Sequence, residues 1–198
     1  MPTSGIHEIV GRKLSSKYNY LDNYDFYLGL IAPDSVNYLG FAPKEDRWNA
    51  HLRDKDLSMW KSNIINFYND NKDNYNESFI KGYITHIMTD IVYDESFYLD
   101  VTLPMKSINK VDHEAHLYML EEMKAYSSNN DFIYTKEILS KSNNTYNIRN
   151  ISKELLSNWK NKIINEEKVD IKPQFITNKI IEDLTTKVEE ELIKYKVL

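Results

Sequence analysis

The sequence contains no cysteine among its 198 residues. This absence excludes disulfide bonds, thiolate metal sites and cysteine catalysis. Any bound metal ion must therefore be held by His, Asp, Glu or backbone oxygen atoms. A chain of this length can bury a large core without disulfide support.

Long apolar runs and an excess of basic residues are also missing. No window approaches the roughly 20 apolar residues of a membrane span, and residues 1–16 lack the apolar stretch of a signal peptide. We expect a cytoplasmic protein without a transmembrane segment, with leaderless secretion as the alternative. The 25 Lys and Arg against 30 Asp and Glu give a net charge of -5, so no stable nucleic-acid partner is expected.

Apolar residues repeat at intervals of three and four along most of the chain, which is typical of amphipathic helices. The pattern predicts an all-α multi-helix bundle in a single domain, 1–198. The metal-site core is expected within 1–126, and packing helices within 127–198. The best strand candidate is 131–135. The expected helices cover residues 6–14, 22–31, 57–68, 77–98, 105–126, 131–140, 152–165 and 173–196.

His86 and Asp90 lie one helical turn apart in the most apolar long segment, so they share a helix face. Burying a carboxylate without a partner is costly, and this one needs a cation, hydrogen-bond donors or a metal ion. The pair indicates either a metal site or a His–Asp hydrogen bond inside a helix bundle.

Three further residues offer the same ligand chemistry. Asp34 follows an apolar segment beside Pro33, His7 lies beside the apolar stripe of the first expected helix, and His51 lies between them and His86. Alone, Asp34 fits a turn and His7 fits a core position. Together, imidazole nitrogen and carboxylate oxygen without thiolate form the ligand set of a hydrolytic zinc site.

A second group of candidates lies further along the chain. Asp112 and His116 are one helical turn apart, and His113 is also a helix neighbour of His116. Asp94 lies one turn beyond Asp90 and faces either a metal ion or water.

In order and spacing, these candidate ligands and the residues around them resemble the motifs of the zinc-dependent bacterial phospholipase C family. That family shares its all-helical architecture with the P1-type nucleases. The resemblance covers about the first 120 residues. It rests on His7, on the Gly-x-x-x-Pro-Asp phrase of 29–34, on His51, on the Gly-Tyr-x-x-His-x-x-x-Asp phrase of 82–90 and on the His-containing segment 112–116.

The resemblance implies a cluster of up to three zinc ions. Asp34, His51, His86 and Asp90 would surround the central ions, and His7 would join a neighbouring ion. The family's Asp at the position of Asp34 is also a proposed general base.

The chain departs from the family at three ligand positions. The best-known secreted enzymes of the family use an N-terminal tryptophan as a ligand, whereas this sequence begins Met1-Pro2. Ser96 stands where the family has a His six residues after the helix Asp, so Asp94 is the candidate replacement. The family's His-x-x-x-Glu pair is matched by Asp112 and His116, with the ligand types exchanged.

We therefore expect a metal-dependent phosphoester hydrolase, phospholipase C-like, with two or three zinc or other divalent ions. Its substrate would be a small phosphoester or a phospholipid, and the loop 37–48, with Tyr38, Phe41 and Trp48, would form the rim of the site or pack against the core. The alternatives are a nucleotide or nucleic-acid phosphoesterase of the same superfamily and a non-catalytic metal-binding helical module. The sequence gives no indication of the oligomeric state.

Overall fold

The structure is a computed structural model that describes residues 2–98, 112–130, 132–141, 143–167 and 172–198. For residues 112–116 and 132–134 it describes the backbone but not the side chains. The described residues form an all-α bundle without a strand, as the periodicity predicts. The strand candidate at 131–135 is wrong, because the described part of it is helical.

The helical elements follow one another along the described residues. They are α1 (Ser4–Lys17), η1 (Asn19–Leu21), α2 (Tyr24–Ile31), η2 (Pro33–Asn37), α3 (Lys44–Ala50), α4 (Leu57–Asn71), α5 (Glu77–Val92), the π-helical turn η3 (Tyr93–Phe97), α7 (Asp112–Asn129), α8 (Phe132–Ser140), α9 (Lys153–Ile164) and α10 (Asn178–Lys194).

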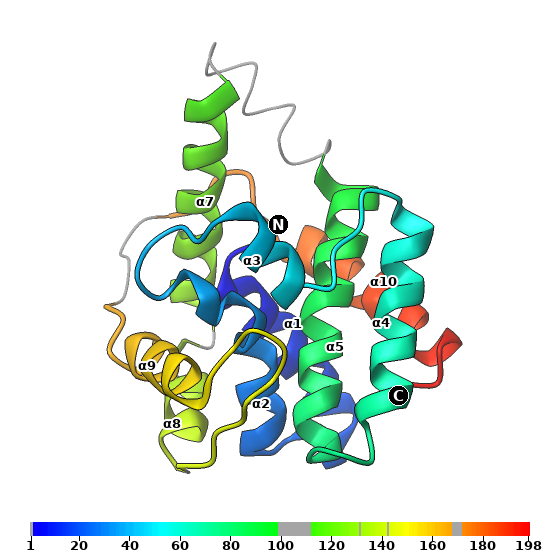
Figure 1. Ribbon diagram of the computed structural model, residues 1–198. Coiled ribbons are helices and arrows are strands. Elements are labelled where there is room, and N and C mark those ends of the chain that lie inside the picture. Colours follow the sequence, from blue (N-terminus) through cyan, green and yellow to red (C-terminus); the bar gives the residue numbers. More distant parts are fainter. Residues whose placement is uncertain (1, 99–111, 131, 142, 168–171) are drawn as a thin grey trace.

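Helix α5 lies at the centre of the bundle (Figure 1). Helices α1, α2, α4 and α10 pack against it, while α7, α8 and α9 pack on α1, α2 and η2. Buried side chains from α1 through α10 join one hydrophobic core. Every residue of α5 from Gly82 to Val92 is buried, which agrees with its apolar sequence.

Two glycines bring α2 and α5 into close backbone contact. A Cβ atom added to Gly29 would lie 2.1 Å from the carbonyl oxygen of Phe79, and one added to Gly82 would lie 2.0 Å from that of Phe26. Neither backbone can move aside without separating the helices. Because α2 leads directly into Asp34 and α5 carries His86, this contact sets the distance between two site residues.

Gly82→Ala is therefore expected to lower the free energy of unfolding by about 3 kcal/mol, since it forces packed helices apart. Denaturant unfolding measures the change. Gly11→Ala is the matched control, because the three atoms nearest its added Cβ all belong to the outer part of the Leu30 side chain, which can adopt another rotamer. An equal effect of the two substitutions would contradict the role assigned to the α2–α5 contact.

The last helix begins later than the sequence indicates. The prediction that Pro173 opens it is wrong: α10 begins at Asn178, where the Thr177 hydroxyl accepts a hydrogen bond from the Ile180 amide. The amides of Gln174 and Phe175 instead donate to the buried Glu122 carboxylate, at 2.7 and 2.8 Å. These hydrogen bonds hold the segment in a non-helical path.

No helix among the described residues is long and apolar enough to cross a membrane. Residues 105–111 of the helix expected at 105–126 lie outside the described residues, and α7 itself begins at Asp112.

Candidate metal centre

Five residues far apart in the sequence meet beside the middle of α5. His7 comes from α1, Asp34 from η2, His51 from the end of α3, and His86 and Asp90 from α5. Four of them are at most 1% exposed, and Asp34 is 9% exposed. The cluster therefore lies inside the bundle, with Asp34 as its most accessible member.

The imidazole nitrogens and the carboxylate oxygens face one another at separations too long for good hydrogen bonds. His7 Nε2 lies 3.5 Å from Asp90 Oδ1, and His51 Nε2 lies 3.5 Å from Asp34 Oδ1. His86 Nε2 lies 3.3 Å from His51 Nε2 and 3.8 Å from Asp90 Oδ2. Such spacing leaves room for an ion between the groups.

Two of the imidazoles are oriented by backbone carbonyls. His86 Nδ1 lies 2.7 Å from the oxygen of Leu30, and His51 Nδ1 lies 2.8 Å from that of Arg47. A carbonyl accepts only from an N–H, so it fixes the proton on Nδ1 and leaves the Nε2 lone pair directed into the cluster. This second-layer contact is typical of metal-ligating histidines.

The backbone at His51 is itself anchored to the core. The Trp60 indole donates to the His51 carbonyl at 2.8 Å, and the buried Tyr83 hydroxyl donates to the Ala50 carbonyl. Leu52 then adopts a φ of 52°, which ends α3 abruptly. His51 is thus held at a helix end by contacts with α4 and α5.

Two members of the cluster have buried atoms without a hydrogen-bond partner. These atoms are both ring nitrogens of His7 and both carboxylate oxygens of Asp90. Leaving a buried charged oxygen unpaired costs at least about 1–3 kcal/mol. A divalent cation would satisfy these atoms, and the thiol-free donor set suits zinc and related ions.

The pKa values follow from this burial. Burial lowers the pKa of His86 to about 4 and, with the nearby His86, lowers that of His7 well below its ordinary value. Burial raises the pKa of Asp90 to about 7. For Asp34, burial opposes ionisation, but His51 and the other imidazoles outweigh it and hold the pKa well below its ordinary range. The imidazoles of His7 and His86 are therefore neutral, the protonation state that binds metal. At His51, burial is outweighed by the Asp34 and Asp90 carboxylates, which raise the pKa.

The cluster contains two overlapping groups with ligand atoms within 4.8 Å of one another: His7, Asp34 and His86, and His51, His86 and Asp90. These buried groups can hold a metal ion. Together the two groups contain five residues, and the sequence motifs predict the same five as metal ligands.

The remaining candidates lie elsewhere. Asp94 does not join the cluster: it lies in the π-helical turn η3, and its carboxylate pairs with Arg53 at 2.8 Å. The side chains of Asp112, His113 and His116 lie outside the described residues, although their backbone forms the start of α7.

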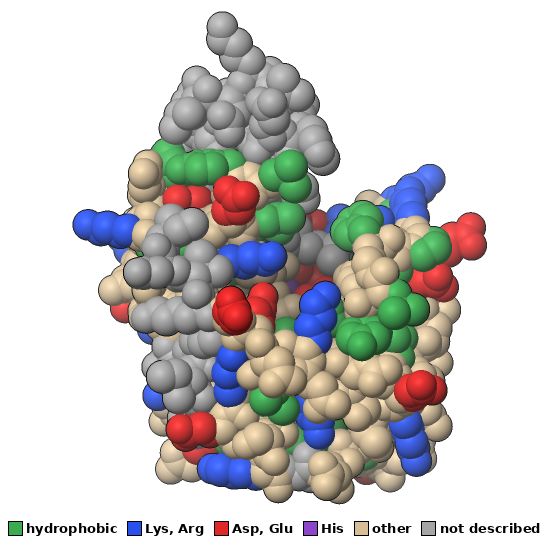
Figure 2. All heavy atoms as spheres, turned by 90° about the vertical axis from the view of Figure 1, so that its left-hand side faces the viewer, with side chains coloured by type: hydrophobic (Ala, Val, Ile, Leu, Met, Phe, Trp, Pro, Cys, Tyr) green, Lys and Arg blue, Asp and Glu red, His purple; other side chains and the backbone are tan. Residues whose placement is uncertain are grey.

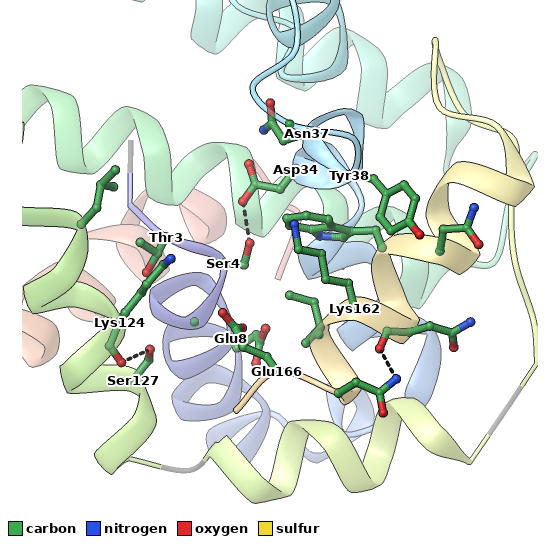
Figure 3. A pocket seen from close by; sticks show the side chains of 18 of the residues that line it. Thr3, Ser4, Glu8, Asp34, Asn37, Tyr38, Lys124, Ser127, Lys162 and Glu166 are labelled. Atoms are coloured by element: carbon green, nitrogen blue, oxygen red, sulfur yellow. Dashed lines mark hydrogen bonds between the residues drawn. The ribbon is translucent and has the colours of Figure 1, made fainter. Parts of the chain in front are cut away.

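A pocket of about 1060 Å³ lies next to the cluster and shares Asp34 with it. Figure 3 shows Asp34 accepting a hydrogen bond, 2.8 Å long, from the Ser4 hydroxyl at the pocket wall. Tyr38 and Phe41 of the expected rim loop line the pocket, whereas Trp48 contacts Lys44 instead.

The opposite walls of the pocket come from α7 and α9, which the sequence motifs do not point to. Their lining residues include Lys124, Trp159 and Lys162. The one sequence signal for this surface is on α9, where the polar residues Asn158, Asn161 and Lys162 stand close to Trp159. Glu8 also lines the pocket, where burial and Glu166 raise its pKa to about 8.

Comparison of the chain with protein-family models, curated proteins and solved structures gave no match.

Proposed function

We propose that this protein is a metal-dependent phosphoester hydrolase, phospholipase C-like in the arrangement of its ligands. The observation that carries the proposal is the buried cluster of three imidazoles and two carboxylates beside a pocket. The order of the sequence motifs supports the same assignment.

His7, His51 and His86 would each supply one nitrogen, and Asp34 and Asp90 would supply carboxylate oxygens. Two divalent ions, zinc as the first candidate, suit this set because a carboxylate can contribute an oxygen to each of two ions. When bound, such ions would lower the pKa of water and stabilise the charge that develops on a phosphoryl group.

Asp34 would serve the reaction with its two oxygens in different roles. Oδ1 faces the imidazoles of His51 and His86, whereas Oδ2 accepts the Ser4 hydroxyl. Its low pKa keeps the carboxylate charged at neutral pH. Oδ2 would then orient an attacking water molecule in the pocket by accepting a hydrogen bond from it.

The pocket supports a catalytic metal site rather than a structural one. Structural zinc sites are closed, with every coordination position filled by protein. Asp34 instead borders a pocket that a small molecule can enter. This contact supports a hydrolase over a non-catalytic metal-binding module.

A panel of phosphoesters tests the proposal. Protein purified without a metal-affinity column would be assayed with p-nitrophenyl phosphate, bis(p-nitrophenyl) phosphate and phosphatidylcholine, before and after chelation. We expect hydrolysis of at least one ester, its loss with chelator and its return with zinc. Hydrolysis that is unaffected by chelation would refute the proposal.

Ser4→Ala should lower kcat about tenfold without changing metal content, because groups that orient a ligating carboxylate contribute about 10- to 100-fold. Steady-state kinetics with elemental analysis checks both values. Ser16→Ala is the matched control, since Ser16 is exposed on the same helix and bonds only the Lys13 carbonyl. Equal activity of the two variants would show that Ser4 does not support Asp34.

A further inference from the structure

The part of the pocket wall that α7 and α9 form contains two lysines, one from each helix. Lys124 lies on α7 and Lys162 on α9, and both side chains point into the pocket (Figure 3). Among the described residues, neither ammonium group has an ion-pair partner at 4 Å or less, whereas Lys17, Lys61 and Lys81 all do. Two cations without acidic partners therefore border a pocket that already holds Asp34.

The same wall contains a buried donor without an acceptor. Trp159 is 8% exposed, and its indole nitrogen has no hydrogen-bond partner. The Lys162 ammonium lies 5.0 Å from the centre of the Trp159 ring and partly covers it. The hydroxyl of Thr3, also a pocket residue, is likewise buried without a partner. An acceptor-rich ligand would satisfy these groups.

The two glutamates of the pocket lie close to one another. In Figure 3, Glu8 and Glu166 lie close together near the middle of the view, below Ser4 and between Lys124 and Lys162. Figure 2 shows the face with the pocket, where blue and red side chains surround a hollow near its centre. In the view of Figure 3, the two lysine side chains thus lie on either side of Ser4, which donates to Asp34, and the two glutamates lie below it.

We propose that this pocket binds a phosphomonoester, with Lys124 and Lys162 holding the non-bridging oxygens of its dianionic phosphate next to the metal cluster. This inference rests on the proposed function and names its substrate class. A phosphodiester carries one negative charge, whereas a monoester carries close to two at neutral pH, so two added cations favour the monoester.

The rest of the pocket indicates the alcohol part of the substrate. Its lining beyond the lysines includes amide and hydroxyl groups, together with the carboxyl groups of Glu8 and Glu166. Such groups bind the hydroxyl groups of a polar alcohol. Apolar side chains, among them those of Leu39, Phe41 and Leu120, line the same pocket, so the alcohol part of the phosphomonoester would contact both polar and apolar groups. The polar lining residues are Thr3, Ser4, Asn37, Ser127, Ser128, Asn158, Asn161 and Asn165.

Binding of inorganic phosphate to the zinc-loaded protein, measured by calorimetry, is the first test. Lys124→Gln and Lys162→Gln should each weaken binding about tenfold, the effect of losing one charge-assisted hydrogen bond. Lys153→Gln is the matched control, because Lys153 is exposed on α9 and outside the pocket. Absence of phosphate binding, or equal affinity of all three variants, would overturn the proposal.

A second measurement separates this proposal from the hydrolase itself. The wild-type kcat/KM for p-nitrophenyl phosphate should exceed that for bis(p-nitrophenyl) phosphate, and the double lysine variant should lose most of that preference. A diester preference that the lysines do not affect would overturn the substrate class while leaving the hydrolase in place. Lysine-dependent phosphate binding without hydrolysis of any ester would support the pocket and refute the hydrolase.

Discussion

Asp90→Asn is expected to abolish metal retention and hydrolysis while stabilising the metal-free protein at pH 8. Both oxygens of Asp90 are buried without a hydrogen-bond partner, and burial raises its pKa from the ordinary 3.8 to about 7. Above pH 7 the metal-free protein must ionise this group in the core, at a cost of about 4 kcal/mol. Asparagine removes that charge but leaves a buried amide, so a net gain of about 2 kcal/mol remains.

Metal affinity should fall by more than about 100-fold in the same variant. Loss of a residue that only contacts a metal ligand already lowers metal affinity about 10- to 100-fold, and Asp90 would be a ligand itself. Elemental analysis and denaturant unfolding at pH 8 give the two numbers. Asp94→Asn is the matched control: Asp94 lies one turn further along and pairs with Arg53, so metal content should not change. Full metal content and activity in Asp90→Asn would show that the site is assigned wrongly.

Removal of metal from the wild-type protein should lower its thermal stability, and the loss should be larger at pH 8 than at pH 5. Zinc at about 100 times its dissociation constant adds about 2.7 kcal/mol, which raises Tm by about 5–10 °C for a domain of this size. Zinc binding requires ionised Asp90 and neutral imidazoles, so protons compete with it at low pH.

The pKa shifts set the direction of this pH dependence. In the metal-free protein the raised pKa of Asp90 contributes stability below pH 3.8, and that contribution is lost as the pH rises to about 7. The lowered pKa of His86 acts in the opposite sense, because the neutral buried ring loses stability relative to the unfolded state as the pH falls from 6.5 towards 4. Between pH 5 and pH 8 the folded protein loses a proton at Asp90, whereas His86 is already neutral, so the stabilising effect of zinc grows over this range because of Asp90.

Scanning calorimetry with and without chelator, at several pH values, measures this effect. Protein carrying His86→Ala should show no difference between the two conditions. A Tm of the wild-type protein that is independent of chelator at pH 8 would contradict the presence of a metal site.

The local part of the fold could be predicted from the sequence. The spacing of apolar residues gives the helices, and the four-residue interval places His86 and Asp90 on one face of α5. Asp34 follows α2 because Pro33 cannot continue the hydrogen-bond pattern of that helix. These inferences depend only on neighbours within one or two helical turns.

The rest depends on contacts between distant segments. Asp94 has the same spacing on the helix as a ligand would have, but a π-helical turn and Arg53 place it outside the cluster. The lysines of the pocket wall belong to α7 and α9, and only packing against α1 and η2 brings them towards Asp34. The relation to phospholipase C stays a prediction that rests on the order of the motifs.

The number of metal ions per chain tests the central claim most directly. Protein purified without a metal-affinity column would be analysed for its elements, and again after exposure to zinc and removal of the free ion. The buried cluster of His7, Asp34, His51, His86 and Asp90 predicts two or more divalent ions per chain. A protein that retains none, even after zinc is added back, would contradict the account and leave a helical bundle with a buried His–Asp network.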